Sequence, residues 1–498
     1  MKPTACAGVL SRRRRLAQAA RRGFFSVAFL AIIALAISTA SAASDVRSGT
    51  AKVALPWKLN PYPSTYRPLP RQDTLIVNAT ILDGAGRRYD QASILLRDGM
   101  IVEIGARTIA APAGAKTIDA AGRWVTPGII DVHSHDGDFS APFTSLDAQN
   151  SDVSESSDPV TGNVWAEHSI NVQDPSFERA LAGGVTTLQI LPGSSNLIGG
   201  RSVVLKNVPA TTVQAMKFPD APYGLKMACG ENPKYTFGGK GKFPSTRMGN
   251  VAGIRAAWLE ATEYRRKWLD YESGKHDKLP DDDLKMDTLA GVLDGDISVH
   301  WHCYRADDMA TLFDAAREAG FRITAFHHAV EAYKIPELFV KNRTCAVVWS
   351  DWWGYKMEAL DGIRENAAFV DAAGACVAMH SDSPWLGQRL TLEAGKAMAA
   401  GNRAGLHVSE EHAIQWVTLN SAKALGLDAK IGSLETGKNA DLVVWSTDPL
   451  SVYAKADQVF IDGALVYDRA DATRRPRSDF ELGQPSMAPP AKAGGDGK

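Results

Sequence analysis

The sequence predicts an α/β fold: a (β/α)8 TIM-like barrel joined to a small composite β-sandwich that is formed from both ends of the chain. Two observations predict this fold. Residues 127–424 alternate short apolar runs with helical patterns, which is typical of a parallel α/β barrel. Two β-rich segments, residues 75–126 and 425–470, flank this region, which suggests that they pair in one small domain.

The first 42 residues have the composition of a secretory signal peptide. Arginines at 12–15, 21 and 22 precede an apolar run over 24–37, and small residues follow at 40–42. We therefore expect a periplasmic or otherwise exported protein, by general or twin-arginine export. The apolar run is shorter than the roughly 20 residues of a comfortable membrane span, so no stable span is expected in the mature form; a retained anchor is the minor alternative.

Charge and cysteine content narrow the function classes. Residues 1–42 hold seven cations and no acids, so their removal takes the formal net charge from −1 to about −8. This balance argues against a nucleic-acid partner. We separately expect a small-molecule substrate, and the sequence is compatible with a homo-oligomer. The remaining cysteines form no CxxC pair, and we expect buried free thiols, although one disulfide is compatible with export; they are Cys229, Cys303, Cys345 and Cys376.

The flanking segments are predicted in chain order. Residues 43–74, an N-terminal extension, are proline-rich and irregular and are expected to form a linker or a strap across the surface. Residues 75–126 contain β-rich runs with Asp-Gly and Gly-Arg turns and predict hairpins, as do residues 425–470. Residues 471–498 are predicted to be a disordered tail.

Within the barrel region, apolar runs predict strands and amphipathic stretches predict helices. The expected strands are residues 128–133, 185–191, 225–230, 297–302, 322–328, 345–349 and 375–382. The expected helices include residues 176–184, 309–320, 362–374 and a long one over 251–274, whose aromatic stripe predicts core packing. The glycine-rich residues 191–200 are predicted to be a loop.

The polar ends of these strands carry metal-type side chains. Catalytic groups of such barrels sit at the carboxyl ends of several strands. His133 and His135 are two apart, so on a strand their side chains point the same way and could hold one ion. A bare HxH pair is weak evidence, since a surface strand end can also carry histidine.

Further strand ends add to this pair. His302 is favoured over the deeper His300, which is expected to be packed or to support a ligand. His328 is chosen over His327, because neighbouring residues of a strand face opposite sides and His327 would then face the helices. Asp382 follows the last strand.

A carboxylate is also needed to bridge two ions that lie about 3.5–4 Å apart. Glu231 is the candidate, with Lys226 and Lys234 as alternatives if one of them is carboxylated.

The ordered set of motifs resembles the amidohydrolase superfamily, in particular its branch of imidazolonepropionase-like enzymes and metal-dependent dipeptidases. The resemblance covers about residues 75–470 and includes WVTPGIIDVHSH at the barrel entry and GSLETGKNADLVVW at its exit. It departs at the bridging position, where many relatives have a carboxylated lysine and this chain has GENPK, residues 230–234.

The resemblance implies a metal-dependent hydrolase of carbon–nitrogen bonds, with amides, cyclic amides or dipeptides as substrates. It implies one or two divalent ions, of which zinc suits the nitrogen and oxygen ligands, with manganese, iron or cobalt as alternatives. A metal-activated hydroxide would attack the carbonyl, and Asp382 would shuttle the proton to the leaving nitrogen. The implied ligands are His133 and His135 with Asp382 for one ion, His302 and His328 for the other, and Glu231 shared.

Loop residues and competing functions stay open at this stage. Arg305 is a candidate for pairing with a substrate carboxylate, against a surface salt bridge with Asp307 or Asp308. An aromatic loop either floors a substrate pocket or packs as a lid; it consists of Trp349, Trp352, Trp353 and Tyr355. A deaminase on the same scaffold and a non-catalytic binding protein are the alternative functions.

Overall fold

The computed structural model describes residues 54–106, 108–471 and 473. The predicted signal peptide and nearly all of the predicted C-terminal tail lie outside these residues. Within the described ranges, no helix combines the length and the apolar content that a membrane crossing would require.

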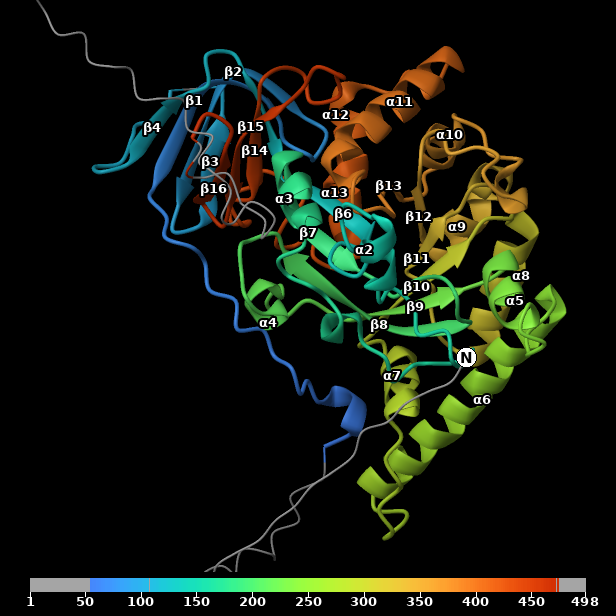
Figure 1. Cartoon of the computed structure of the whole chain (residues 1–498). Coiled ribbons are helices and arrows are strands. Elements are labelled where there is room, and N and C mark those ends of the chain that lie inside the picture. The colour runs from blue at the N-terminus through green and yellow to red at the C-terminus, as the bar shows by residue number, and fades with distance from the viewer. Residues whose placement is uncertain (1–53, 107, 472, 474–498) are drawn as a thin grey trace, which may run out of the picture. The chain divides into compact units, whose positions relative to one another are not determined.

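Strands from both ends of the chain form one eight-stranded sheet, seen in Figure 1 as blue and red arrows in the same layer. Its order is β16-β15-β14-β5-β1-β2-β3, with β4 paired to β1. The two ends meet where β14 runs antiparallel to β5, with Leu442 opposite Pro127 and Trp445 opposite Trp124. The strands are β1 (Thr74–Leu82), β2 (Arg88–Arg97), β3 (Met100–Gly105), β4 (Lys116–Asp119), β5 (Trp124–Pro127), β14 (Leu442–Trp445), β15 (Ala456–Ile461) and β16 (Ala464–Asp468).

The second sheet is a nearly closed eight-stranded barrel. Its strands follow one another in sequence order, and adjacent strands are hydrogen-bonded from β6 to β13. They are β6 (Ile129–Ser134), β7 (Val185–Ile190), β8 (Ile198–Lys206), β9 (Gly224–Ala228), β10 (Ser298–Cys303), β11 (Ala325–His328), β12 (Cys345–Val348) and β13 (Val377–Met379).

One barrel strand differs from the prediction. β8 is antiparallel to both β7 and β9, so the barrel is not wholly parallel. The predicted loop over 191–200 overlaps the start of this strand at Ile198. The start of β8 was not recognised in the sequence because glycines at 199 and 200 weaken the strand pattern.

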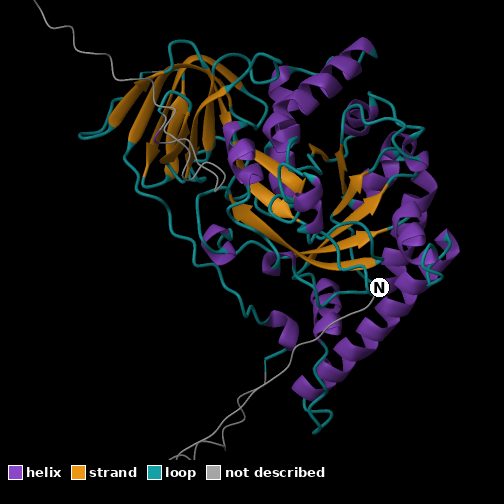
Figure 2. Cartoon of the chain, viewed as in Figure 1, coloured by secondary structure: helices purple, strands orange, loops and turns teal. Residues whose placement is uncertain are grey.

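Helices separate most of the barrel strands (Figure 2), as the alternation predicts, but β7 and β8 are joined by a loop without a helix. The long predicted helix is α6, Arg247–Glu272, which begins where the Thr246 hydroxyl accepts a hydrogen bond from the Gly249 amide. Its predicted stripe is buried at Ile254, Trp258 and Trp268, which confirms core packing. The other helices are α2 (Ser145–Gln149), α3 (Pro175–Ala182), α4 (Val213–Met216), α5 (Glu231–Gly238), α7 (Leu284–Leu293), α8 (Ala306–Ala319), α9 (Pro336–Asn342), α10 (Asn366–Ala372), α11 (Leu390–Arg403), α12 (Glu410–Ala413) and α13 (Leu419–Ala424).

The described part of the N-terminal extension is an irregular segment that is hydrogen-bonded to other parts of the chain. Residues 54–73 contain only one short 3-10 turn, η1 (Pro56–Lys58). Trp57 donates its indole N–H to Asp294, the Ser64 hydroxyl donates to the carbonyl oxygen of Lys217, and the Tyr66 hydroxyl donates to Asp462. These bonds tie the segment to distant parts of the chain.

The expectation of free thiols is wrong, because all four described cysteines form disulfides. Cys229 pairs with Cys303, and Cys345 pairs with Cys376. Cys303 ends β10 and Cys229 directly follows its neighbour β9, so strand pairing brings together residues that are 74 apart in sequence. Sequence spacing alone does not reveal that proximity.

Candidate active site

The two histidines of the HxH pair and Asp382 converge at the carboxyl ends of the first and last barrel strands. Nε2 of His133 lies 3.3 Å from Nε2 of His135. Oδ1 of Asp382 lies 3.2 Å from the first of these nitrogens and 3.1 Å from the second. The structure therefore brings three predicted ligands, from positions up to 249 residues apart in sequence, to one point.

These separations fit a metal ion. In a tetrahedral zinc site with bonds of about 2.0–2.1 Å, two ligand atoms lie about 3.3 Å from each other. Two nitrogens and one carboxylate oxygen at 3.1–3.3 Å match that spacing. Their types also suit zinc.

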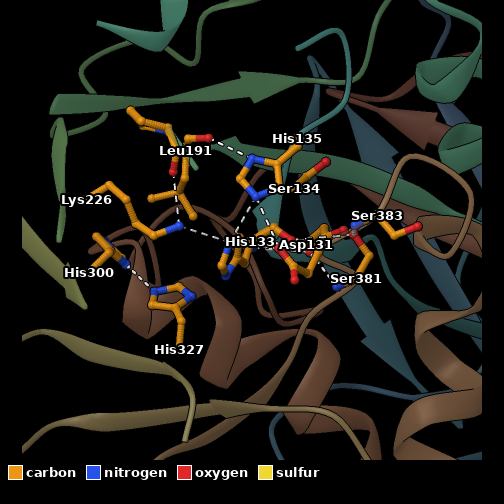
Figure 3. Close-up of polar contacts among 12 residues, drawn as sticks. Asp131, His133, Ser134, His135, Leu191, Lys226, His300, His327, Ser381 and Ser383 are labelled. Carbon is orange, nitrogen blue, oxygen red and sulfur yellow. Dashed lines mark hydrogen bonds and ion pairs between the residues drawn. The ribbon is translucent and has the colours of Figure 1, made fainter. Parts of the chain in front are cut away.

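Asp131 holds this group in position through hydrogen bonds to the backbone at two strand ends. Its Oδ1 accepts hydrogen bonds from the backbone N–H groups of His133 and Ser381, both at 3.2 Å. The Asp382 amide in turn donates to the carbonyl oxygen of His133 at 2.9 Å. Figure 3 shows Asp131 between the HxH segment and Ser381. The first and last strand ends are thus locked together.

Lys226 lies directly beside the pair, on β9. Its Nζ is 3.2 Å from Nε2 of His133 and donates a hydrogen bond to the carbonyl oxygen of Pro192 at 3.0 Å. Figure 3 shows the Lys226 amine directed at the His133 ring. The side chain is fully buried, and burial lowers the pKa of Lys226 to about 8.

His327 faces the barrel interior, which corrects the prediction that it faces the helices. Its Nε2 lies 2.9 Å from Nδ1 of His300, and its ring centroid is 4.7 Å from that of His133 (Figure 3). His328 has a φ of 70°, which ends the strand's alternation at that residue. The side chains of His327 and His328 therefore both turn inward. His300 is packed in the interior, as predicted.

A second group of histidines extends the first. His328 and His380 each offer a nitrogen that groups with one from His133, all within 4.8 Å of one another. The His302 ring centroid is 4.4 Å from that of His328, so both residues predicted for a second ion adjoin this group. Among described residues, both ring nitrogens of His302 and His380 and Nδ1 of His133 and His328 are buried without a hydrogen-bond partner. Buried polar atoms normally have partners, and a metal ion would supply one.

Electrostatics keep these histidines neutral and the aspartate charged. Burial lowers the pKa of His302 and His328 well below the ordinary value, and it lowers that of His380 to about 3. Burial acts to raise the pKa of Asp382, but the His135 hydrogen bond and nearby positive charge outweigh it and lower the pKa overall. Neutral imidazole and ionised carboxylate are the forms that bind metals.

The remaining predicted residues lie elsewhere at the barrel mouth. Glu231 begins α5, and its carboxylate is 3.9 Å from the Lys356 amine; within the described chain it does not join either histidine group. Lys234 lies further along α5, with its amine over the Tyr235 ring. Of the two lysine alternatives, Lys226 is the one that contacts a histidine of the pair.

Arg305 forms a salt bridge with Asp307, which is the alternative to substrate binding that the sequence left open. Its Nε and Nη2 donate to the two carboxylate oxygens of Asp307, at 2.9 and 2.6 Å. Arg305 and Glu231 nevertheless line one pocket of about 670 Å³.

Three residues at the site were missed by sequence reasoning. His380 precedes Asp382 by two, the same spacing that singled out the HxH pair, so a signal was present. The Tyr304 ring stacks on that of His328 at 5.0 Å, and the Lys356 amine lies 4.0 Å from the Tyr304 ring centroid. Neither has a sequence signal, because loop folding alone places them.

Comparison with known proteins places this geometry in a family. The model of the amidohydrolase family matches residues 297–466. A solved structure, an amidohydrolase from Thermotoga maritima, is 36% identical and superposes with a TM-score of 0.73, covering 80% of this chain and 100% of that one. The chain belongs to the amidohydrolase superfamily.

Curated relatives agree with that assignment. An amidohydrolase of Hapsidospora irregularis is 33% identical over 423 residues, which is 80% of this chain but only 42% of that protein's length. An imidazolonepropionase of Mesorhizobium japonicum is 26% identical over 394 residues, covering 74% of this chain and 90% of the relative. This amidohydrolase is thus a member of a family of hydrolases that act on carbon–nitrogen bonds.

Proposed function

We propose that this chain is an exported, metal-dependent amidohydrolase that hydrolyses an amide, cyclic amide or dipeptide bond of a small molecule. The observation that carries the proposal is the group formed by His133, His135 and Asp382, whose ligand atoms have the spacing of a divalent metal site. Family membership supports the reaction class.

The side chains fit one or two divalent ions, with zinc favoured. His133, His135 and Asp382 would hold the first ion, and His302 and His328 the second, with His380 adjacent. For the bridging group, the contact with His133 favours a carboxylated Lys226 over Glu231. When bound there, the metal would lower the pKa of a water molecule toward about 7 and polarise the substrate carbonyl.

Asp382 is positioned to move the proton. Its low pKa leaves it ionised at neutral pH, so it can accept a proton from water as the water oxygen adds to the carbonyl carbon. It then returns the proton to the nitrogen as the C–N bond breaks, which yields a carboxylic acid and an amine. The His135 hydrogen bond at 3.1 Å holds the carboxylate in place for both transfers.

Two structural features belong to this proposal. The disulfides support export, because disulfides persist mainly in oxidising compartments. We also infer that the sheet built from both chain ends closes on itself as a composite β-sandwich. One buried cluster supports this, since it contains Ile76 and Ile94 of the first half together with Leu442 and Phe460 of the second.

Metal analysis joined to a substrate screen tests the function. The mature chain should contain at least one equivalent of transition metal and hydrolyse members of a panel of N-acyl amino acids, dipeptides and cyclic amides. Asp382→Asn should lower kcat at least 100-fold, within the usual range for a lost acid–base group. Asp314→Asn is the matched control, because that aspartate is exposed on α8 and pairs only with Arg317 among described residues.

The outcomes separate the proposal from its competitors. Absence of stoichiometric metal, or full activity in Asp382→Asn, would refute it. Ammonia release from an amino-substituted heterocycle with no hydrolysis of the panel would point to the deaminase alternative. Recovery of the protein from the cytoplasm of its own host, with residues 1–42 retained and all five cysteines as free thiols, would refute export.

A further inference from the structure

A pocket of about 270 Å³ opens beside His328, on the side of the segment that follows β12. Most of its wall comes from two short stretches of that segment, residues 349–353 and 362–366. His328 belongs to the histidine group as well, so the pocket adjoins the proposed metal site.

The wall next to the histidines is aromatic. The Trp349 ring packs on His328 with centroids 4.5 Å apart, and Trp352 stacks on Trp349 at 4.6 Å with an interplanar angle of 4°. Trp349 is buried with Tyr304, Val330 and Ala359 in one apolar cluster, which fixes its position. Such a surface favours the apolar part of a ligand.

Most polar groups of the pocket already have partners. The Asp351 carboxylate accepts a hydrogen bond from Lys396 at 2.8 Å, and the Ser350 hydroxyl donates to Glu393 at 2.7 Å. The Asn366 amide donates to the carbonyl oxygen of Ala329, and its oxygen accepts from the Tyr333 amide. None of these three groups is a cation that could pair with an anionic ligand.

Arg364 is different. It lines the same pocket, is exposed, and has no hydrogen bond or ion pair to any residue in the described part of the chain. A guanidinium presents paired donors that match a carboxylate, and this geometry makes arginine the usual residue for that task.

We propose that this pocket binds the carboxylate-bearing residue of the substrate, with Arg364 pairing with the carboxylate and the tryptophans contacting an apolar side chain. This inference rests on the proposed function. Such a pocket would favour N-acyl amino acids and dipeptides with an aromatic or branched C-terminal residue over neutral cyclic amides. The volume suits one side chain, because it lies below the roughly 300 Å³ at which pockets for drug-sized ligands begin.

Calorimetric binding to the full metal-loaded chain tests the pocket without relying on turnover. The probes are N-methanesulfonyl-L-phenylalanine, its neutral amide, and N-methanesulfonylglycine, whose sulfonamide bond resists hydrolysis, so the metal ligands stay unchanged. We expect the acid to bind at least 10-fold more tightly than its amide and than N-methanesulfonylglycine. Arg364→Gln should reduce the difference between acid and amide to less than twofold, and Arg364→Lys should keep part of it.

Arg317→Gln is the matched control, because that arginine is an exposed cation on α8, paired with Asp314. It should keep the full preference for the acid. Trp352→Ala should remove the preference for the phenylalanine side chain while leaving the acid preferred over the amide. Melting curves of each variant confirm folding.

Equal binding of acid and amide, or a preference that survives Arg364→Gln, would overturn the pocket assignment. A preserved binding pattern in a protein that hydrolyses none of the panel would uphold the pocket and refute the amidohydrolase function. Hydrolysis of the panel together with binding that does not depend on Arg364 would uphold the amidohydrolase function and refute the pocket assignment.

Discussion

The side-chain nitrogen of Lys226 lies 3.2 Å from Nε2 of His133, inside the barrel and out of contact with solvent. A hydrogen bond to the carbonyl oxygen of Pro192 holds it there. Because burial lowers the pKa of Lys226 to about 8, part of the population is a neutral amine at neutral pH. A neutral amine is the form that can react with carbon dioxide to give a carbamate, which would supply the missing bridging carboxylate.

Lys226→Met therefore should lower metal affinity by 10- to 100-fold, the range found when a supporting group of a metal site is lost, and more if Lys226 is itself a ligand. Metal content after dialysis against a weak chelator measures the change. Lys234→Met is the matched control and should retain metal, because its amine lies over the Tyr235 ring.

Glu231→Gln decides between the two bridging candidates. We expect it to retain metal, because the nearest cation to its carboxylate is Lys356 at 3.9 Å and it is outside both histidine groups of the described chain. Loss of metal in Glu231→Gln together with retention in Lys226→Met would reverse the assignment.

The Cys229–Cys303 disulfide should support the site as well as the fold. Cys303 directly follows His302, and Cys229 lies two residues before Glu231. The two disulfides close loops of 74 and 31 residues, so loss of either should cost about 4 kcal/mol by the chain-entropy argument. Denaturant unfolding of the Cys229→Ser/Cys303→Ser and Cys345→Ser/Cys376→Ser double variants measures this.

The two double variants should differ in metal retention. We expect the Cys229→Ser/Cys303→Ser protein to lose metal more readily, because its disulfide anchors the strand end that carries His302. The Cys345→Ser/Cys376→Ser protein should keep wild-type metal content at temperatures where it is folded. Equal retention in both would show that the first disulfide serves stability alone.

Most of the candidate metal site could be predicted because its placement depends on strand geometry. The parity of His133 and His135, and the position of Asp382 after the last strand, follow from alternation along strands and from the shared rim of a barrel. The rule misled at this strand end because His327 follows the regular alternation and faces the interior, while the positive φ of His328 turns that side chain inward as well. A backbone angle of this kind is set by tertiary packing and leaves no mark in the local pattern.

The other errors concern contacts between segments that are distant in sequence. The antiparallel β8 was hidden by Gly199 and Gly200, and it is held by pairing with β7 and β9. The pairing of Cys229 with Cys303 requires the order of strands in the barrel. Lys356 reaches the site because the loop after β12 folds back over Tyr304.

Replacing Trp349 with alanine should destabilise the fold far more than replacing Trp353. Trp349 is 5% exposed and packs against His328 and His380, so Trp349→Ala should lower the free energy of unfolding by about 3–5 kcal/mol. Trp353 is 65% exposed, and its main bond is from the indole N–H to the carbonyl oxygen of Leu360. Trp353→Ala should therefore cost about 1 kcal/mol or less. Equal losses in denaturant unfolding would contradict the assigned burial.

The ion pair between His412 and Asp371 should make stability depend on pH outside the active site. Nε2 of His412 lies 2.7 Å from Oδ2 of Asp371, which links α12 to α10. The hydrogen bond to Asp371 raises the pKa of His412, and partial burial opposes it. Because the folded pKa lies above the ordinary value of about 6.5, the protonated pair stabilises the fold fully below that pH and loses its effect as pH rises through the folded pKa.

His412→Gln should thus lower the free energy of unfolding at pH 5.5 and have little effect at pH 9. The difference should stay below about 1 kcal/mol, since 44% of the His412 side chain is exposed and solvent screens the pair. Denaturant unfolding of both proteins at the two pH values measures it. Asp371→Asn should abolish the same pH dependence while also weakening the Trp416 indole bond at every pH, because Trp416 donates to the other carboxylate oxygen at 3.0 Å. A wild-type advantage over His412→Gln that is constant from pH 5.5 to 9 would mean that the contact acts through packing, with no contribution from charge.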